Sequence, residues 1–172
     1  MKSIEQKSLE KLLQIIPDHP GIRLLHFADS GEEIPQIISS FIEDKGYEYQ
    51  INCLDDTFFL TMRHTFAKSQ HIHPIKFTLQ RPRYMIQGKI FDYVFVTAPV
   101  AASMRENFLK RVHPIIKNGG NILIFLPKKE QEQRWEWLRL LEEHYYVASS
   151  TIDDLFAHYD VVISKKMHGW GG

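Results

Sequence analysis

The sequence predicts an α/β fold built on a mostly parallel sheet of seven strands with an antiparallel pair at its end. As far as residue 143, short apolar runs rich in β-branched and aromatic residues alternate with segments of helical periodicity. This alternation is typical of parallel strands joined by crossover helices. After residue 143 two strand-like runs follow one another directly, which predicts the antiparallel pair. At 172 residues, the chain is expected to form a single domain, residues 1–172.

The clearest strand–helix–strand unit lies between residues 91 and 126. Phe91–Val96 and Ile122–Leu126 are apolar runs of the kind found in buried parallel strands. The helix expected between them has its apolar residues on one face, and Ser103 and Glu106 have capping-box spacing at its start. The pair Gly119–Gly120 is expected to end that helix, because a left-handed residue is least strained without a Cβ. The unit predicts a right-handed crossover.

The elements before this unit continue the same alternation. An amphipathic N-terminal helix that ends at Pro17 is expected over residues 1–17, and strands are expected at Ile22–Ala28 and Tyr47–Cys53. The helix between these strands is expected to begin near residues 32–33. Pro35 then falls in the first turn, where its missing N–H breaks no helical bond.

The remaining elements are shorter or less regular. Either Asp55 or Asp56 is expected to cap a helix, and a third strand is expected at Ile75–Leu79, before an irregular and basic segment, Gln80–Lys89. The last expected elements are a helix, two strands and a Gly-rich tail, at Glu130–Glu143, Tyr145–Ile152, Tyr159–Ser164 and residues 165–172. The buried side of that helix is expected to carry Trp135, Leu138 and Leu141.

The composition excludes several classes of protein. The formal net charge is zero and the pI is about 7.1, so no overall field attracts the chain to nucleic acid or to a membrane. Cys53 is the one cysteine, which excludes an internal disulfide. No apolar run is long enough to span a bilayer, and the mixed charges of Met1–Leu12 are unlike a signal peptide. A cytoplasmic location is therefore expected.

The order of elements and two stretches of sequence resemble the class I S-adenosylmethionine-dependent methyltransferases. Phe91–Val96 is similar to the fourth strand of that family, and Ile116–Ile124 resembles its helix–Gly–Gly–strand segment. The resemblance covers nearly the whole chain. It implies a three-layer, Rossmann-like sheet with an antiparallel terminal strand, S-adenosylmethionine as cofactor, and methyl transfer to an unknown substrate by catalytic residues that remain unassigned.

The cofactor motif departs from the family pattern. The family has an acidic residue and closely spaced glycines in its first strand and the following loop, so that the cofactor lies against bare backbone. Here Ala28 and Ser30 stand roughly where glycines are expected, Asp29 lies between them, and Gly31 alone remains. His26 stands where the acid would attract the methionine amino group, which a neutral imidazole does less well. The resemblance thus implies a cofactor loop of residues 28–31, either narrowed or no longer functional.

The resemblance implies two further contacts. The family has an acid after its second strand that binds the ribose hydroxyls; Asp55 or Asp56 stands there, and each could instead be a helix cap. Amino-methylating members carry a polar anchor and two prolines after the fourth strand. Thr97 is the residue that could serve as the anchor and Pro99 is the proline that remains; the alternative is a plain strand end with a turn.

Two other ligand classes are disfavoured. A dinucleotide cofactor would place its pyrophosphate at a helix N-terminus, where Glu32 and Glu33 would repel it. His71 and His73 would share one face of a strand, but no carboxylate or cysteine is expected nearby to complete a metal site. No metal is therefore expected.

An RNA-binding role is also considered. Arg81, Arg83 and Tyr84 follow the third strand and should lie on the rim of the sheet, where guanidinium groups beside an aromatic ring suit a base or a phosphate. A solvated loop is the alternative. In the tail, Trp170 suggests a docked segment or an oligomer contact.

Three functions thus remain open: a methyltransferase, a methyltransferase-like binding or assembly module that has lost its cofactor, and an RNA-binding protein.

Overall fold

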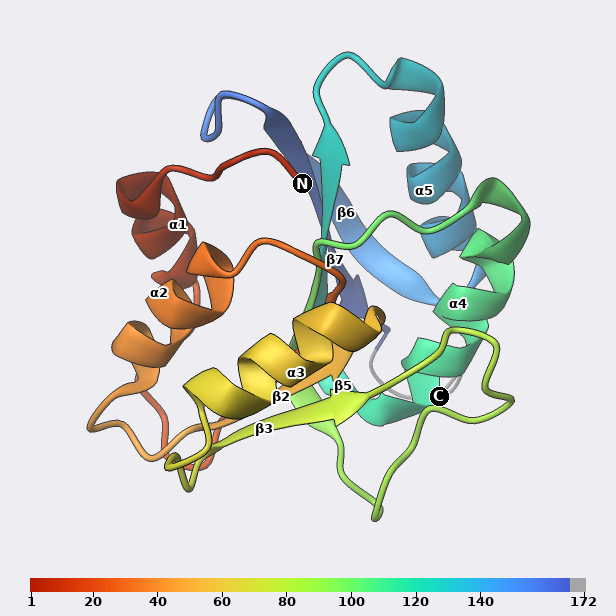
Figure 1. The fold of residues 1–172 in the computed structure, drawn as a ribbon. Coiled ribbons are helices and arrows are strands. Elements are labelled where there is room, and N and C mark those ends of the chain that lie inside the picture. Colours follow the sequence, from red (N-terminus) through yellow and green to blue (C-terminus); the bar gives the residue numbers. More distant parts are fainter. Residues whose placement is uncertain (168–172) are drawn as a thin grey trace.

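The computed structural model describes residues 1–167 and shows a seven-stranded sheet with helices on both faces (Figure 1). The strands are β1 (Arg23–Ala28), β2 (Glu48–Cys53), β3 (Ile72–Lys76), β4 (Phe91–Val96), β5 (Ile116–Pro127), β6 (Tyr146–Ile152) and β7 (Tyr159–Lys166). The helices are α1 (Gln6–Leu13), α2 (Glu33–Ile42), α3 (Asp56–Thr65), α4 (Arg105–Val112) and α5 (Gln131–Glu143), with 3₁₀ turns at Ala102–Met104 and His113–Ile115.

The strand order is β3-β2-β1-β4-β5-β7-β6, and β7 alone runs antiparallel to its neighbours. The predicted fold class is confirmed, including the parallel pairing of β1 with β4, in which Leu25 lies opposite Val94. In the sheet, β2 and β3 lie on one side of β1, whereas β4 and the later strands lie on its other side. Such a switch point leaves a crevice at the carboxyl ends of the strands.

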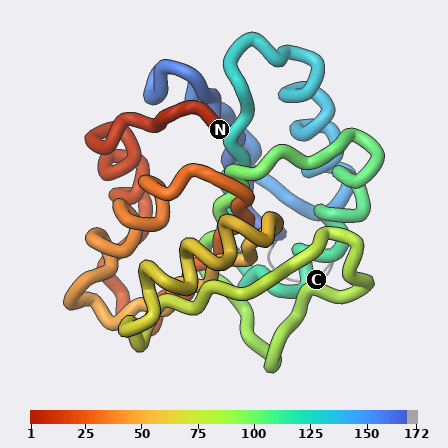
Figure 2. The backbone as a smooth tube through the Cα atoms, viewed as in Figure 1, coloured from red at the N-terminus to blue at the C-terminus, as the bar shows by residue number. Residues whose placement is uncertain are grey.

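Two apolar clusters hold the layers together. The helices α1, α2 and α3 pack on one face of the sheet, whereas α4 and α5 pack on the other. No helix links β3 to β4; the irregular segment 77–90 covers that part of the second face, and Phe77 and Tyr84 are buried in the cluster. Figure 2 shows the N-terminal segment running past the end of β5 to the beginning of β7, where the Lys2 N–H donates to the Tyr159 hydroxyl at 2.7 Å.

The predicted elements of the first half of the chain are present, but some of their bounds differ. The N-terminal helix α1 covers Gln6–Leu13 and does not continue to Pro17. The helix α2 begins at Glu33 and has Pro35 in its first turn, as predicted. The third strand was placed too late: β3 begins at Ile72 and contains both His73 and Pro74. It lies at the edge of the sheet and, among the strands of residues 1–167, pairs with β2 alone. Pro74 is tolerated because an edge strand has one side that makes no ladder hydrogen bonds.

The helix before β5 was predicted incorrectly at both ends. Ser103 lies in a 3₁₀ turn, and no side-chain cap is made there. Gly119 and Gly120 lie inside β5, where the pairing with β4 is irregular. A Cβ on residue 120 would lie 2.8 Å from the Lys117 carbonyl oxygen and 2.9 Å from that of Asp92, so a glycine allows two backbone segments to approach.

The buried face of α5 also differs from the prediction. Trp137, Leu140 and Leu141 are buried, whereas Trp135 is 71% exposed. Both sets of residues have helical spacing, and the packing of α5 on β6 and α4 selects between them. Leu138 is partly buried against the same cluster.

The C-terminal segment is more regular than predicted, since β7 continues to Lys166. Trp170 and the rest of the Gly-rich tail lie outside the described residues. Across residues 1–167, none of the helices has the length and apolar character needed to cross a lipid bilayer.

Candidate functional site

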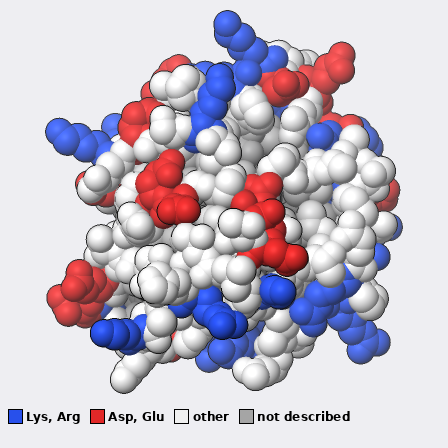
Figure 3. All heavy atoms as spheres, viewed as in Figure 1, with Lys and Arg blue, Asp and Glu red and all other residues white. Residues whose placement is uncertain are grey.

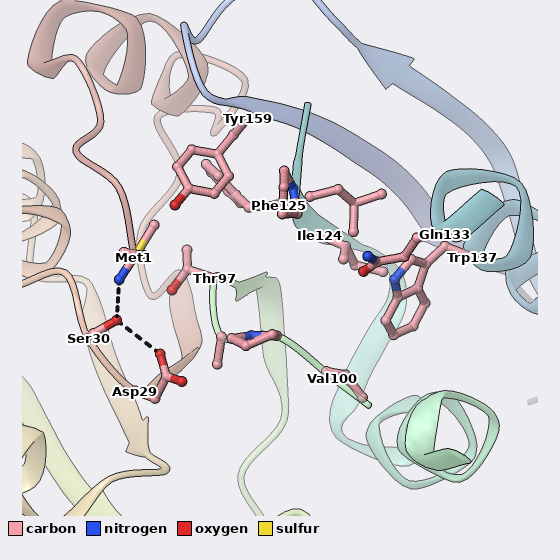
Figure 4. Close-up of a pocket in the computed structure, with 14 residues that line it drawn as sticks. Met1, Asp29, Ser30, Thr97, Val100, Ile124, Phe125, Gln133, Trp137 and Tyr159 are labelled. Carbon is pink, nitrogen blue, oxygen red and sulfur yellow. Dashed lines mark hydrogen bonds between the residues drawn. The ribbon is translucent and has the colours of Figure 1, made fainter. Parts of the chain in front are cut away.

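Two cavities lie at the carboxyl ends of the strands. The first, which we name the β5-side cavity, has a volume of about 270 Å³ and runs from Met1, Asp29 and Ser30 past Thr97 to Trp137 (Figure 4). The second, the β2-side cavity, has a volume of about 380 Å³ and is bordered by Asp55, Thr78 and Gln80. The two cavities share Asp29, Ser30 and Pro99 as a common wall. They form one elongated crevice at the predicted place.

The loop after β1 separates the two cavities. Ala28 is completely buried, whereas Asp29, Ser30 and Gly31 are half-buried. Gly31 has a φ of +84°, a conformation in which a side chain would be strained. A Cβ at this position would also lie 2.6 Å from the sulfur of Met1. The one glycine that remains in the motif is thus required both by its backbone angle and by a close contact.

Met1 contacts this loop through its ammonium group and its thioether. Its ammonium group donates to the Ser30 hydroxyl at 3.0 Å, and that hydroxyl donates to the Asp29 carboxylate at 3.1 Å (Figure 4). Its thioether sulfur packs on Gly31. An ammonium group and a sulfur atom, both carried by one methionine, are therefore held at the loop that the sequence indicates for the cofactor.

Asp55 and Asp56, which the sequence could not tell apart, have different surroundings. Asp55 is the N-cap of α3: its Oδ2 accepts from the Phe58 N–H at 2.9 Å. Asp55 also borders the β2-side cavity, and its Oδ1 has no hydrogen-bond partner among the described residues. The Asp56 side chain is 87% exposed, lies 3.8 Å from Lys76, and borders neither cavity. Asp55 can thus cap the helix with Oδ2 and still offer Oδ1 to a ligand.

His26 is buried below the crevice and connects three strands. Its Nδ1 lies 2.7 Å from the Tyr49 hydroxyl on β2, and its Nε2 lies 2.7 Å from the Thr97 hydroxyl at the end of β4. Complete burial lowers the pKa of the imidazole from 6.5 to about 3, so the ring is neutral at physiological pH. His26 therefore cannot attract an amino group in the way that an acid would; its hydrogen bonds instead fix the position of Thr97.

The segment between β4 and α4 closes the β5-side cavity, and Arg105 holds it in place. The Arg105 Nε donates to the Val100 carbonyl at 3.0 Å, and a second nitrogen donates to Glu136 on α5 at 3.0 Å. The guanidinium lies 5.8 Å from the centre of the Trp137 ring, a cation–π distance. Neither Arg105 nor Trp137 was identified from the sequence, because the helical pattern was taken to place Trp135 inward.

The residues considered for RNA binding do not form the expected surface. Tyr84 is 2% exposed: its ring packs against Phe27 and Phe77, and its hydroxyl donates to the Leu79 carbonyl at 2.8 Å. The ring is therefore not available to stack on a base. Arg81 lies over the Phe77 ring at 5.1 Å, whereas Arg83 is exposed.

The charges near the crevice also differ from those of an RNA-binding surface. In Figure 3, acidic side chains lie over the beginnings of α2 and α3, and basic ones lie along the lower margin of the face. RNA phosphates would meet repulsion near the crevice rather than a continuous basic patch.

His73 on β3 and His71 just before it have a carboxylate beside them, contrary to the prediction. Glu48 on β2 lies 2.7 Å from His73 Nε2 and 3.5 Å from His71 Nδ1. Partial burial raises the pKa of Glu48, but the hydrogen bonds to the two histidines outweigh it, so the net pKa is lowered. In the part of the chain that the structure describes, no group of three or more such side chains is arranged to hold a metal ion.

Comparison with known proteins supports the architecture. No protein-family model and no curated protein sequence matches the chain. Among solved structures, a TehB-like SAM-dependent methyltransferase from Corynebacterium glutamicum aligns over 92% of this chain and 86% of its own, with a TM-score of 0.71 and 14% identity. A SAM-dependent methyltransferase from Aquifex aeolicus aligns over 91% and 88%, with a TM-score of 0.70 and 15% identity.

A third structure, the CurJ carbon methyltransferase, matches 94% of this chain with a TM-score of 0.71 and 13% identity, but the match covers only 53% of that longer protein. The chain thus spans about half the length of this relative. Sequence identities this low establish architecture and not activity. The strand order and these matches together show that the chain has the Rossmann-like fold of the class I S-adenosylmethionine-dependent methyltransferases.

Proposed function

We propose that the chain binds S-adenosylmethionine in the crevice formed by the two cavities and transfers its methyl group to a small acceptor. The observation that carries this proposal is the contact of Met1 with the loop after β1. The ammonium bound to Ser30 and the sulfur packed on Gly31 are two groups that the methionine part of the cofactor also carries. The loop therefore suits that part of the cofactor, although its glycines are reduced to one.

The rest of the crevice offers groups for the nucleoside part. Asp55 Oδ1 borders the β2-side cavity and can accept hydrogen bonds from the ribose hydroxyls while Oδ2 continues to cap α3. The volume of each cavity is near the lower end of the roughly 300–1,000 Å³ range of small-molecule sites. The two cavities adjoin each other at their shared residues and together form a longer site. Asp29, reached through Ser30, takes the place of the missing acid for the amino group.

The chemistry of methyl transfer would come from the cofactor, which supplies an electrophilic methyl group on sulfur. The protein would bind, orient and exclude water. Arg105 holds Val100 and α5 together, and so keeps the loop that closes the β5-side cavity in place. Thr97 lies near the Met1 end of that cavity, beside Ser30, where its hydroxyl can contact the ligand.

Calorimetric titration with S-adenosylhomocysteine tests the proposal, with Asp55→Asn and Asp56→Asn as a matched pair. Asn caps a helix about as well as Asp, so Asp55→Asn removes the charge but keeps the cap. We expect this variant to bind about tenfold more weakly, since a hydrogen bond to a charged group contributes about 1.5–3 kcal/mol. Asp56→Asn should bind as the unmodified chain does. Absence of binding heat at millimolar ligand would refute the proposal.

The second candidate is a binding or assembly module that has retained the fold without the cofactor. The contact of Met1 with the loop after β1 also supports this second candidate, because Met1 covers the Gly31 surface against which a cofactor would lie. Deletion of residues 1–3 separates the two candidates. If the crevice is a cofactor site, the deletion variant should bind S-adenosylhomocysteine more tightly, because Met1 no longer competes. If the chain is a module without a cofactor, neither the unmodified chain nor the deletion variant should bind it.

A further inference from the structure

One continuous stretch of the chain carries positive charge without any acidic residue. Residues 57–91, which include most of α3, all of β3 and the segment 77–90, hold six lysines and arginines and no aspartate or glutamate. Since the formal net charge of the whole chain is zero, the remaining residues carry a net charge of −6. Such an asymmetry within one chain indicates an anionic partner. The six cations, which we name the basic edge, are Arg63, Lys68, Lys76, Arg81, Arg83 and Lys89.

The basic edge is accessible and wraps around one edge of the sheet. Four of its side chains are exposed, and two, Arg81 and Lys89, are half-buried. The edge strand β3 lies at its centre, with α3 on one face of the sheet and the segment 77–90 on the other. Arg111 of α4 adds a further cation beside this segment, since its guanidinium donates to the Leu79 carbonyl at 3.1 Å. Figure 3 shows basic side chains along the lower margin of this side of the molecule.

Acidic side chains from other elements border the basic edge in two places. They are Asp56 near the crevice, and Glu43, Asp44 and Glu48 near the start of β3. Asp56 lies 3.8 Å from Lys76, and Glu48 is bound to the two histidines. Within residues 1–167, none of the ion pairs involves the segment 77–90. The cations of that segment are therefore free to meet an anionic group.

Aromatic rings are interleaved with these cations. The Arg81 guanidinium lies 5.1 Å from the centre of the buried Phe77 ring, which holds one face of its plane. Because Arg81 is half-buried, the other face of its plane can stack on a nucleobase. Across β3, the Phe59 ring has Arg63 at 5.8 Å and Lys76 at 5.7 Å from its centre. This mixture of cations and rings suits a strand of phosphates and bases.

The shape of the basic edge selects among anionic partners. Its cations lie on both sides of a sheet edge, so a flat membrane contacts one side at a time, whereas a flexible single strand can bend around the edge. An acidic peptide can also bend, but it carries no base to stack on Arg81. None of the six side chains lines either cavity, and Asp55 and Asp56 repel phosphate at the crevice. The partner is therefore distinct from the ligand of the crevice.

We propose that the basic edge binds single-stranded nucleic acid through its phosphates, with a base stacked on Arg81. The proposal does not rest on the proposed function, because the surface and the crevice are separate. Tyr84, which the sequence suggested for stacking, is buried behind this surface and packs against Phe77.

Fluorescence anisotropy of a labelled oligo-uridylate of about 20 nucleotides tests the proposal, since sites of this kind cover roughly 4–16 nucleotides. With about four phosphates neutralised, the logarithm of the association constant should fall against the logarithm of the salt concentration with a slope of about −3. Absence of binding at about 100 μM protein, or a slope near zero, would overturn the proposal. Phosphatidylserine vesicles and a polyglutamate peptide of equal charge are the competing partners. Either of them binding as tightly as the oligonucleotide would also overturn it.

Two double variants change the net charge equally and form a matched pair. Arg83→Gln with Lys89→Gln should bind about tenfold more weakly at physiological salt, since each lost phosphate contact costs about three- to fourfold. Lys7→Gln with Lys11→Gln, on α1, is the control and should bind as the unmodified chain does, because α2 separates α1 from α3 (Figure 1). An equal loss in both double variants would show a response to net charge alone and would contradict the proposal.

Arg81→Lys separates stacking from charge. It keeps the positive charge and removes the planar group, so the salt slope should stay the same while binding weakens about threefold or more. Unchanged affinity in this variant would refute the stacking of a base on Arg81.

Discussion

Acid should destabilise this protein through His26 more strongly than through an exposed histidine. The imidazole is completely buried, and burial lowers its pKa from 6.5 to about 3 in the folded state. Below about pH 6.5 the unfolded chain binds a proton at this residue, but the folded chain does not until about pH 3. The contribution of His26 to the free energy of unfolding is therefore fully present at neutral pH and is lost progressively as the pH is lowered through this range.

The magnitude follows from the difference in proton binding. A difference of one bound proton changes the free energy of unfolding by about 1.4 kcal/mol per pH unit, so His26 alone should remove about 2 kcal/mol between about pH 7 and about pH 5. For a domain of this size, the melting temperature should fall by about 4–8 °C. Urea unfolding of the unmodified chain and of His26→Gln at both pH values isolates the effect, because every other group contributes equally to both proteins.

The control is His64→Gln, which removes an exposed imidazole from α3. We expect the control to keep the acid sensitivity of the unmodified chain, and His26→Gln to lose about 2 kcal/mol of it. Equal acid sensitivity in the unmodified chain and His26→Gln would refute the reasoning. If His26→Gln does not fold, proton NMR of the unmodified chain gives the same answer, since the His26 ring should remain neutral down to about pH 4.

Three further predictions concern stability and can be checked together by urea unfolding. Asp55→Ala should lower the free energy of unfolding by about 1 kcal/mol through loss of the α3 cap, whereas Asp55→Asn should change it little. Gly120→Ala should lower it by about 1–3 kcal/mol, because the added Cβ would meet two carbonyl oxygens at under 3 Å; an unchanged midpoint would show that β5 moves easily. Lys166→Met should lower it by about 1–2 kcal/mol, because Nζ donates to the carbonyls of His113 and Ile116 at 2.9 and 3.0 Å, and the exposed Lys165→Met is its control.

Four of the residues predicted for the cofactor site border one crevice, and their role in binding stays a prediction. Asp29, Ser30, Asp55 and Thr97 border the crevice, because parallel strands of known order end at the same edge of the sheet. Tyr84 was misjudged, since a position after a strand does not reveal which way the ring points.

Two contacts that the sequence did not reveal have a related origin. Glu48 is far in the sequence from His71 and His73, and only the register of β2 and β3 brings them together. The Met1 contact joins residues 29 positions apart and has no local signal at all.

Local chemistry in the sequence determined the fold. Apolar runs, helical periodicity and turn residues specify strands and helices within a few residues, and their order leaves few topologies open. The tertiary structure decided what depends on distant partners: which face of α5 carries a buried tryptophan, which of two adjacent aspartates faces a cavity, and which hydroxyl groups His26 contacts. These outcomes follow from packing and hydrogen-bond satisfaction, which arise only when the strands lie side by side.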